Sequence, residues 1–288
     1  MAAEGVREIR KRIRSTQKTA QITKTMQMVA ASRLKKSQAI LREATPYAQK
    51  MEMLLSHLLG TGETPEHPFF QTRDIKTIGL VVITSDRGLC GAYNARVIAK
   101  AEAFLLAHAT QTVKLIMIGR KGTDHFKTRS WPILLECPDV AGKPDYDKIV
   151  QVTQRLIQVY LAGEVDTLYL AYSHYHSALS MTPSLVKVLG LTREEPGQTA
   201  RPVQTLLEPD RKTVWDTFLP RYMMSKLYLL FISAATAENS ARMIAMKMAT
   251  DNAKEMVEAL TLRRNKARQA AITKEILEIV TAGEALKG

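Results

Sequence analysis

Glycine and proline are missing from two long stretches of the 288-residue sequence, Val6 to Thr45 and Arg221 to Ala282. Both residue types interrupt helices, so each stretch is free to form one long helix. The second would be about 90 Å long at 1.5 Å per residue. A compact chain of this length has a radius of gyration of only about 19 Å. We therefore expect this helix to protrude from its domain and to need a second helix beside it.

Cysteine and long apolar runs are also scarce. Cys90 and Cys137 are the only cysteines, and they lie far apart without a CxxC partner, so the sequence suggests neither a zinc site nor a redox pair. We expect both to be small buried residues. No apolar run approaches the roughly 20 residues that span a bilayer. The chain starts with a charged pattern and no apolar signal core, so the expectation is a cytosolic protein.

Motifs for catalysis or cofactor binding are missing as well. The sequence contains neither GxxxxGK[ST] nor GxGxxG. The turn from Gly88 to Gly91 and the basic turn from Gly119 to Gly122 are better explained as structural, and Cys90 lacks an obvious base. His174 and His176 have a spacing compatible with a metal, but two ligands do not make a site. We predict no catalytic residue, no cofactor and no metal on this chain.

Positive charge is abundant. The formal net charge is +13 and the sequence pI is about 9.7. A basic surface favours an acidic partner, and charge alone leaves nucleic acid, an anionic membrane and an acidic protein surface open. Much of the charge lies in the first predicted helix, which contains Arg7, Arg10, Lys11, Arg12, Arg14, Lys18, Lys24, Arg33, Lys35 and Lys36.

Both predicted helices carry apolar residues at steps of three and four, which is typical of a helix packed against another helix. We expect Pro46 to kink the first helix or to start a new segment, and Pro220 to kink the second. The first helix shows the stripes Val6, Ile9, Ile13, Thr16, Ala20, Thr23 and Met26, Val29, Ile40, Ala44, Tyr47, Met51, Leu54, Leu58, with a weak point at Arg33 and Ser37. The second shows Met223, Leu227, Leu230, Ala234, Ala237, Ala241, Ile244 and Met248.

The middle of the chain alternates apolar strands with helices, which indicates an α/β layer with mostly parallel pairing. Asp210 is expected to cap the last helix. The predicted strands are 78–84, 113–118, 133–137, 167–175, 179–188 and 203–207, and the predicted helices are 92–108 and 145–161. The expected domains are residues 1–59, 74–207 and 210–288. The fold class is therefore α/β, with a long antiparallel coiled coil of the terminal helices and a central Rossmann-like α/β domain.

Four segments resemble signatures of one family. Residues 22–32 (ITKTMQMVAAS), 85–94 (SDRGLCGAYN), 241–253 (ARMIAMKMATDNA) and 265–276 (NKARQAAITKEI) are similar to motifs of the gamma subunit of F-type ATP synthases, in the same order. They cover both ends and the middle of the chain. The C-terminal region departs from the family pattern at two places. Arg263 and Arg264 directly precede Asn265, and Gly283 lies one position later than is usual in the family.

The resemblance implies a non-catalytic rotor shaft. In that family the coiled coil enters a hexamer of alpha and beta subunits, and the α/β domain lies near the epsilon subunit and the membrane ring of c subunits. Ring rotation then drives ATP synthesis, or its reverse, at the alpha–beta interfaces. The resemblance also implies a protein that lies at the periphery of the cytoplasmic face of a bacterial inner membrane and has no nucleic acid partner.

The resemblance also implies which residues meet the partners. Arg242, Gln269 and Thr273 would contact beta-subunit loops, with Arg268 beside them, and Lys24 and Met26 would lie where beta presses on the shaft. Ala285 and Leu286 would belong to the apical bearing. The residues alone leave two other classes open: a basic coiled-coil protein that binds nucleic acid, with no recognised base-reading module, and an enzyme built on the α/β domain, with no cofactor loop.

Overall fold

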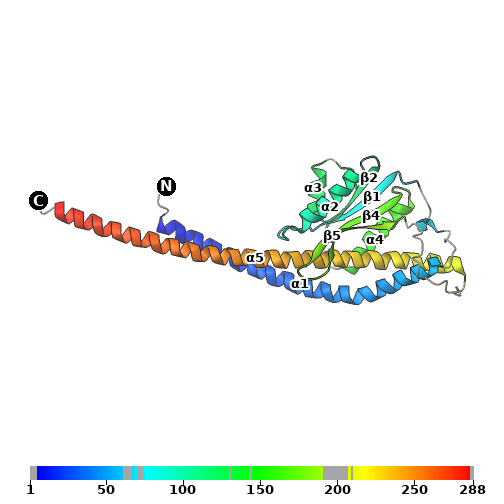
Figure 1. The fold of residues 1–288 in the computed structure, drawn as a ribbon, viewed down its shortest axis with the longest axis horizontal. Coiled ribbons are helices and arrows are strands. Elements are labelled where there is room, and N and C mark those ends of the chain that lie inside the picture. The colour runs from blue at the N-terminus through cyan, green and yellow to red at the C-terminus, as the bar shows by residue number, and fades with distance from the viewer. Residues whose placement is uncertain are drawn as a thin grey trace. The chain divides into compact units, whose positions relative to one another are not determined.

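The computed structural model describes residues 5–60, 67–70, 74–129, 131–142, 145–190, 207–208 and 210–285. In chain order these residues form a long helix, an α/β region and a second long helix (Figure 1). They divide into two compact units. We call Met1–Val29 with Met243–Gly288 the helical unit, and Ala30–Arg242 the sheet unit.

The two long helices are α1 (Val6–Gly60) and α5 (Arg211–Ala285). Both run without interruption through an internal proline, so Pro46 does not start a new segment. The predicted cap of α5 is confirmed, because the Asp210 carboxylate accepts hydrogen bonds from the Thr213 amide at 2.9 Å and the Thr213 hydroxyl at 2.6 Å. These hydrogen bonds lower the pKa of Asp210.

α1 and α5 are antiparallel within the helical unit. The Thr16 hydroxyl lies 3.9 Å from the Met256 sulfur, and the Thr23 and Thr250 hydroxyls are 2.8 Å apart. The numbers on one helix therefore rise as those on the other fall. In the sheet unit the same helices meet where the Tyr222 hydroxyl donates to Glu52 Oε2 at 2.8 Å.

The first stripe predicted on α1 is confirmed, but the second is partly wrong. Val29, Tyr47 and Leu54 are 48%, 56% and 43% exposed. Ser37, predicted to weaken the stripe, is fully buried, and its hydroxyl donates to the Leu34 carbonyl of its own helix. Most of the buried and half-buried positions of α1 form one run of alternating threes and fours: Val6, Ile9, Ile13, Thr16, Ala20, Thr23, Gln27, Ala30, Leu34, Ser37, Leu41, Ala44, Ala48, Met51, Leu55 and Leu58.

Five strands form one sheet in the order β3-β2-β1-β4-β5. Pairing is parallel except between β4 and β5, as predicted for a mostly parallel layer. The predicted strand at 203–207 lies, except for Leu207, outside the described residues. The strands are β1 (Thr77–Ile83), β2 (Thr112–Ile118), β3 (Ile133–Cys137), β4 (Thr167–Tyr175) and β5 (Met181–Leu189).

Helices cover both faces of this sheet. α2 (Tyr93–Ala107) and α3 (Arg120–Lys127) pack on one face, against alternate side chains such as Leu80 and Leu115. α4 (Tyr146–Leu161) packs on the other face, together with residues of α1 and α5 such as Leu55 and Leu219. The predicted α/β domain between two long helices is confirmed, and α5 contributes directly to its core. A single 3₁₀ turn, η1 (Pro68–Phe70), adds two buried phenylalanines.

Candidate partner-contact site

The crevice where doubly wound sheets bind cofactors is filled here by α5. Such crevices lie outside the carboxyl ends of the strands where the strand order reverses, which in this sheet is between β1 and β4. After β1, the Tyr93 hydroxyl donates to the Ala234 carbonyl at 3.3 Å. At the end of β4, the Tyr175 amide donates to the Ser233 hydroxyl at 3.1 Å. In this part of α5, ten successive residues, 231–240, are buried.

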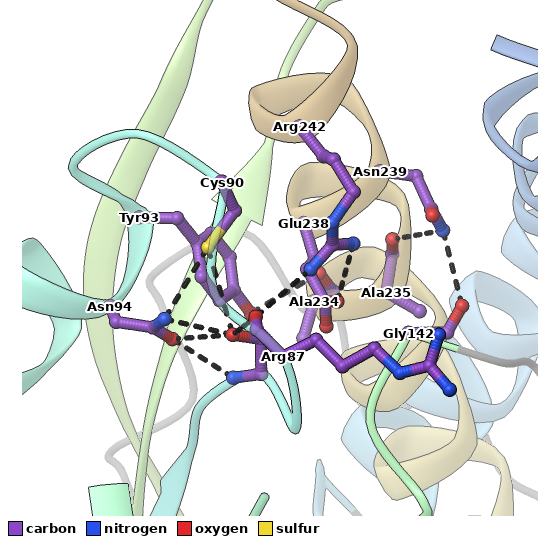
Figure 2. A network of polar contacts seen from close by, with 11 residues as sticks. Arg87, Cys90, Tyr93, Asn94, Gly142, Ala234, Ala235, Glu238, Asn239 and Arg242 are labelled. Atoms are coloured by element: carbon purple, nitrogen blue, oxygen red, sulfur yellow. Dashed lines mark hydrogen bonds and ion pairs between the residues drawn. The ribbon is translucent and has the colours of Figure 1, made fainter. Parts of the chain in front are cut away.

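The turn after β1 is built on a network of small polar groups, shown in Figure 2. The Ser85 amide donates to Asn94 Oδ1 at 2.9 Å, and the Ser85 hydroxyl donates to the Arg87 carbonyl at 2.7 Å. Asn94 Nδ2 reaches the Cys90 sulfur at 3.3 Å. Leu89 has a φ of 64° and is 61% exposed, so the turn holds an apolar side chain in water with a backbone angle that favours glycine.

An ion pair of α5 faces this turn. Arg242 Nη1 donates to Glu238 Oε1 at 2.7 Å, and Arg242 Nη2 donates to the Arg87 carbonyl at 3.1 Å (Figure 2). Only 12% of the Arg242 side chain and 5% of the Glu238 side chain are exposed. Burial raises the pKa of the Glu238 carboxyl, and the Arg242 guanidinium opposes that shift. Burial also raises the pKa of Tyr93, with Glu238 nearby.

A third segment meets the same part of α5. Asn239 Nδ2 donates to the Gly142 carbonyl at 3.2 Å and to the Ala235 carbonyl at 2.8 Å. Gly142 has a φ of +72°, and a Cβ at this position would lie 2.7 Å from Glu238 Oε1. Only glycine combines that backbone angle with such a close approach to the carboxylate.

The residues that the resemblance assigns to partner contacts lie in both units. Arg242 belongs to the sheet unit, where its guanidinium donates to Glu238 and to the Arg87 carbonyl. Lys24 is exposed and Met26 half-buried on α1 in the helical unit. Arg268, Gln269 and Thr273 are exposed on α5 in the helical unit, where the Thr273 hydroxyl bonds the Gln269 carbonyl at 3.0 Å. Ala285 is the last residue of α5, and Leu286 lies outside the described residues.

Sequence reasoning missed a surface on the last turns of α5. Every residue of 268–283 is exposed, although several have large apolar side chains. The signal was present, because apolar residues continue on α5 beyond the length that α1 can cover. We call this surface the apolar end of α5: Ile272, Ile276, Leu277, Ile279 and Val280, which are 44%, 55%, 59%, 72% and 51% exposed.

The other candidates from the sequence have local roles. Cys90 and Cys137 are buried, as predicted. His174 Nδ1 lies 3.0 Å from the Tyr172 hydroxyl and His176 Nε2 lies 2.8 Å from the Thr182 hydroxyl. Among the described residues there is no group of three or more His, Cys, Asp or Glu suited to a metal ion. No helix in the described ranges is long and apolar enough to cross a membrane.

A family model described as ATP synthase matches residues 5–286. The chain is 38% identical to the ATP synthase gamma chain of Protochlamydia amoebophila over 282 residues, covering 98% of this chain and 99% of the relative. It is also 38% identical to the gamma chain of Desulfitobacterium hafniense over 281 residues, with the same coverage.

Solved structures show the same fold. A chain of the central stalk and c-ring of the Tetrahymena thermophila mitochondrial ATP synthase matches with a TM-score of 0.59 and 25% identity, over 79% of this chain and 99% of that one. A chain of the Euglena gracilis mitochondrial ATP synthase matches with a TM-score of 0.69 over 98% of this chain and 94% of that one, at 18% identity.

Proposed function

The chain belongs to the ATP synthase gamma-chain family, and from this premise we propose how its surfaces act in the rotary complex. As a gamma chain it is a non-catalytic subunit, the central stalk and rotor of an F-type ATP synthase. Membership in this family decides against the two other classes that the residues alone left open, a nucleic acid-binding protein and an enzyme. Its part in ATP synthesis is mechanical, so its active surfaces are those that touch other subunits.

The helical unit is the part that contacts the alpha and beta subunits in this proposal. The observation that carries it is the apolar end of α5, where large apolar side chains are exposed on a helix with no covering residue in the described part of the chain. A contiguous exposed apolar surface marks an interaction site. Arg268, Gln269 and Thr273 lie on the same exposed segment, and Lys24 and Met26 lie on α1 of the same unit.

The remaining contacts follow from the family. We propose that the sheet unit binds the epsilon subunit and the c ring, as the central stalk and c-ring assembly of the Tetrahymena relative suggests. The protein then acts at the periphery of the cytoplasmic face of a bacterial inner membrane. We retain 1–59, 74–207 and 210–288 as its functional divisions, with Ala285 and Leu286 in an apical bearing. A rotor of this kind works by making different contacts with several partner conformations.

Site-specific photo-crosslinking tests the assignment of the alpha and beta contacts. A photoreactive amino acid is placed at Gln269 or Thr273 in the assembled complex, and the adducts are identified by mass spectrometry. We expect peptides of the alpha or beta subunits. Leu106, which is 76% exposed on α2 of the sheet unit, is the matched control and should give no such adducts. If neither test position gives adducts with the alpha or the beta subunit, the proposed contact is wrong.

A further inference from the structure

The end of the β4–β5 hairpin carries two histidines whose rings are neighbours. His174 lies on β4 and His176 directly follows that strand, and their ring centroids are 4.6 Å apart. Two nitrogens that bind one metal ion at about 2.0–2.1 Å each lie no more than about 4 Å from each other, and rings this close can meet that condition. His174 is half-buried and His176 is exposed, so water reaches the pair.

A hydroxyl group contacts one nitrogen of each ring. His174 Nδ1 lies 3.0 Å from the Tyr172 hydroxyl, and His176 Nε2 lies 2.8 Å from the Thr182 hydroxyl. The other two nitrogens, His174 Nε2 and His176 Nδ1, have no hydrogen-bond partner among the described residues. Metal-binding histidines have this arrangement, in which one ring nitrogen donates its proton to an oxygen atom that orients the ring and the other nitrogen binds the metal.

The surroundings of the pair do not oppose a cation. No Asp, Glu, Lys or Arg occurs between Asp166 and Lys187, so this part of the hairpin has no cationic side chain to repel an ion. Burial, and secondly the neighbouring His176, lowers the pKa of His174 below its ordinary value of 6.5, so its ring is neutral at pH 7. A histidine binds a metal in this neutral form.

Spacing alone did not make these two histidines a site, but the contact between the rings and the two hydroxyls are observations beyond spacing. We propose that His174 and His176 form an open binding site for one divalent transition-metal ion of the kind that imidazole favours, Cu²⁺, Ni²⁺ or Zn²⁺. His174 Nε2 and His176 Nδ1 are the two protein ligands. Water supplies the others, since no third His, Cys, Asp or Glu joins the pair in the described ranges. The site does not depend on the rotor function proposed above.

An ion at this place fixes a part of the hairpin that contacts both long helices. Tyr175, between the two ligands, accepts a hydrogen bond at its hydroxyl from Gln38 of α1 at 2.6 Å, and its amide donates to the Ser233 hydroxyl of α5 at 3.1 Å. The Ser240 hydroxyl of α5 donates to the Ala178 carbonyl in the turn at 2.6 Å. Because an ion that binds only the folded chain stabilises it, we expect bound metal to raise the melting temperature.

Titration of the full, metal-free chain with Cu²⁺, measured by calorimetry and electron paramagnetic resonance, tests the two ligands. We expect saturation at one ion per chain, a spectrum split by two nitrogen nuclei, and a higher melting temperature for the loaded chain. His176→Gln should abolish this saturable binding. His57→Gln, which removes another exposed histidine on α1, is the matched control and should leave the affinity unchanged. A wild-type chain without saturable binding, or wild-type affinity in His176→Gln, would overturn the proposal.

A second set of variants distinguishes a built site from an adventitious ion only. Tyr172→Phe and Thr182→Val keep both ligands and each remove the hydroxyl that orients one ring. Loss of such an outer partner typically costs about 10–100-fold in metal affinity, so we expect each variant to bind Cu²⁺ at least about tenfold more weakly. Ser184→Ala, which removes a β5 hydroxyl that bonds the Thr182 carbonyl instead, is the control and should bind as the wild type does. Wild-type affinity in either Tyr172→Phe or Thr182→Val would contradict an oriented site.

Discussion

The Thr23 and Thr250 hydroxyls meet inside the helical unit, 2.8 Å apart. Each is also bonded to a backbone carbonyl of its own helix, Thr23 to Thr19 at 3.1 Å and Thr250 to Met246 at 2.8 Å. The pair therefore adds a directional contact between the two helices of this unit. Such a contact favours one register of the two helices over the others.

Replacing these threonines by valine measures that contact. We expect Thr23→Val and Thr250→Val each to lower the free energy of unfolding by about 1 kcal/mol. The double variant should lose less than the sum of the two, because the second replacement removes a hydroxyl that has already lost its partner. Urea unfolding followed by circular dichroism gives the three values. Strict additivity would mean that the hydroxyls do not interact.

His174 gives a prediction about pH. Burial, assisted by the neighbouring His176, lowers the pKa of His174 below its ordinary value of 6.5. The unfolded chain then binds the proton more readily, so the contribution of His174 to stability is complete above pH 6.5 and is lost as the pH falls below it. NMR titration of the six histidines should show the midpoint of His174 below 6.5. In His176→Gln it should rise but stay below 6.5, because burial is the larger cause. A wild-type midpoint at or above 6.5 would contradict this.

Single residues differed in how far the sequence revealed them. The Asp210 cap follows from local chemistry, since a carboxylate before a helix accepts from the first free amides. The Glu238–Arg242 pair has the ordinary spacing of an exposed ion pair on a helix. Nothing local indicates that this turn of α5 lies in the crevice of the sheet, so its burial and its contact with Arg87 depended on the tertiary fold.

The elements themselves were mostly predictable. The alternation of apolar runs with helical patterns predicted β3 and β4 with their observed ends, and the helices α2 and α4 to within one residue. The packing register of the long helices was harder. On α5 the predicted stripe ends in Met248, which is 60% exposed, whereas the observed one passes through Met246, Thr250, Ala253, Val257 and Leu260. Thr250 is polar and Ala253 is small, so hydrophobicity alone does not mark the continuation of the stripe and selects the wrong methionine.

The two methionines provide a matched test of the α5 register. Met246→Ala should lower the free energy of unfolding by about 2–4 kcal/mol, because Met246 is 4% exposed and its removal leaves a cavity. Met248→Ala should change it by no more than about 0.5 kcal/mol. Thermal or urea unfolding of the two full-length variants measures both changes in the free energy of unfolding. Equal losses would show that the stripe predicted from hydrophobicity is the real one.

At the scale of the whole molecule, the sequence constrained the function mainly by exclusion. The missing glycines and prolines predicted two long helices, and the missing motifs argued against an enzyme. The formal charge of +13 favoured an acidic partner but did not indicate which kind. The structure adds that the cofactor crevice of the sheet is filled by α5. Rotation is a property of the assembly, so it could enter only with the family.

Rotation of this chain inside the assembled head is the property that distinguishes a rotor from a static subunit, and it can be observed with a single probe. Leu106→Cys supplies an exposed thiol on α2, while Cys90 and Cys137 are buried, so a visible probe attaches to one place. The head is immobilised through its other subunits and ATP is added. We expect the probe to rotate stepwise in one direction, driven by hydrolysis. A probe that stays fixed while the same complexes hydrolyse ATP would contradict it.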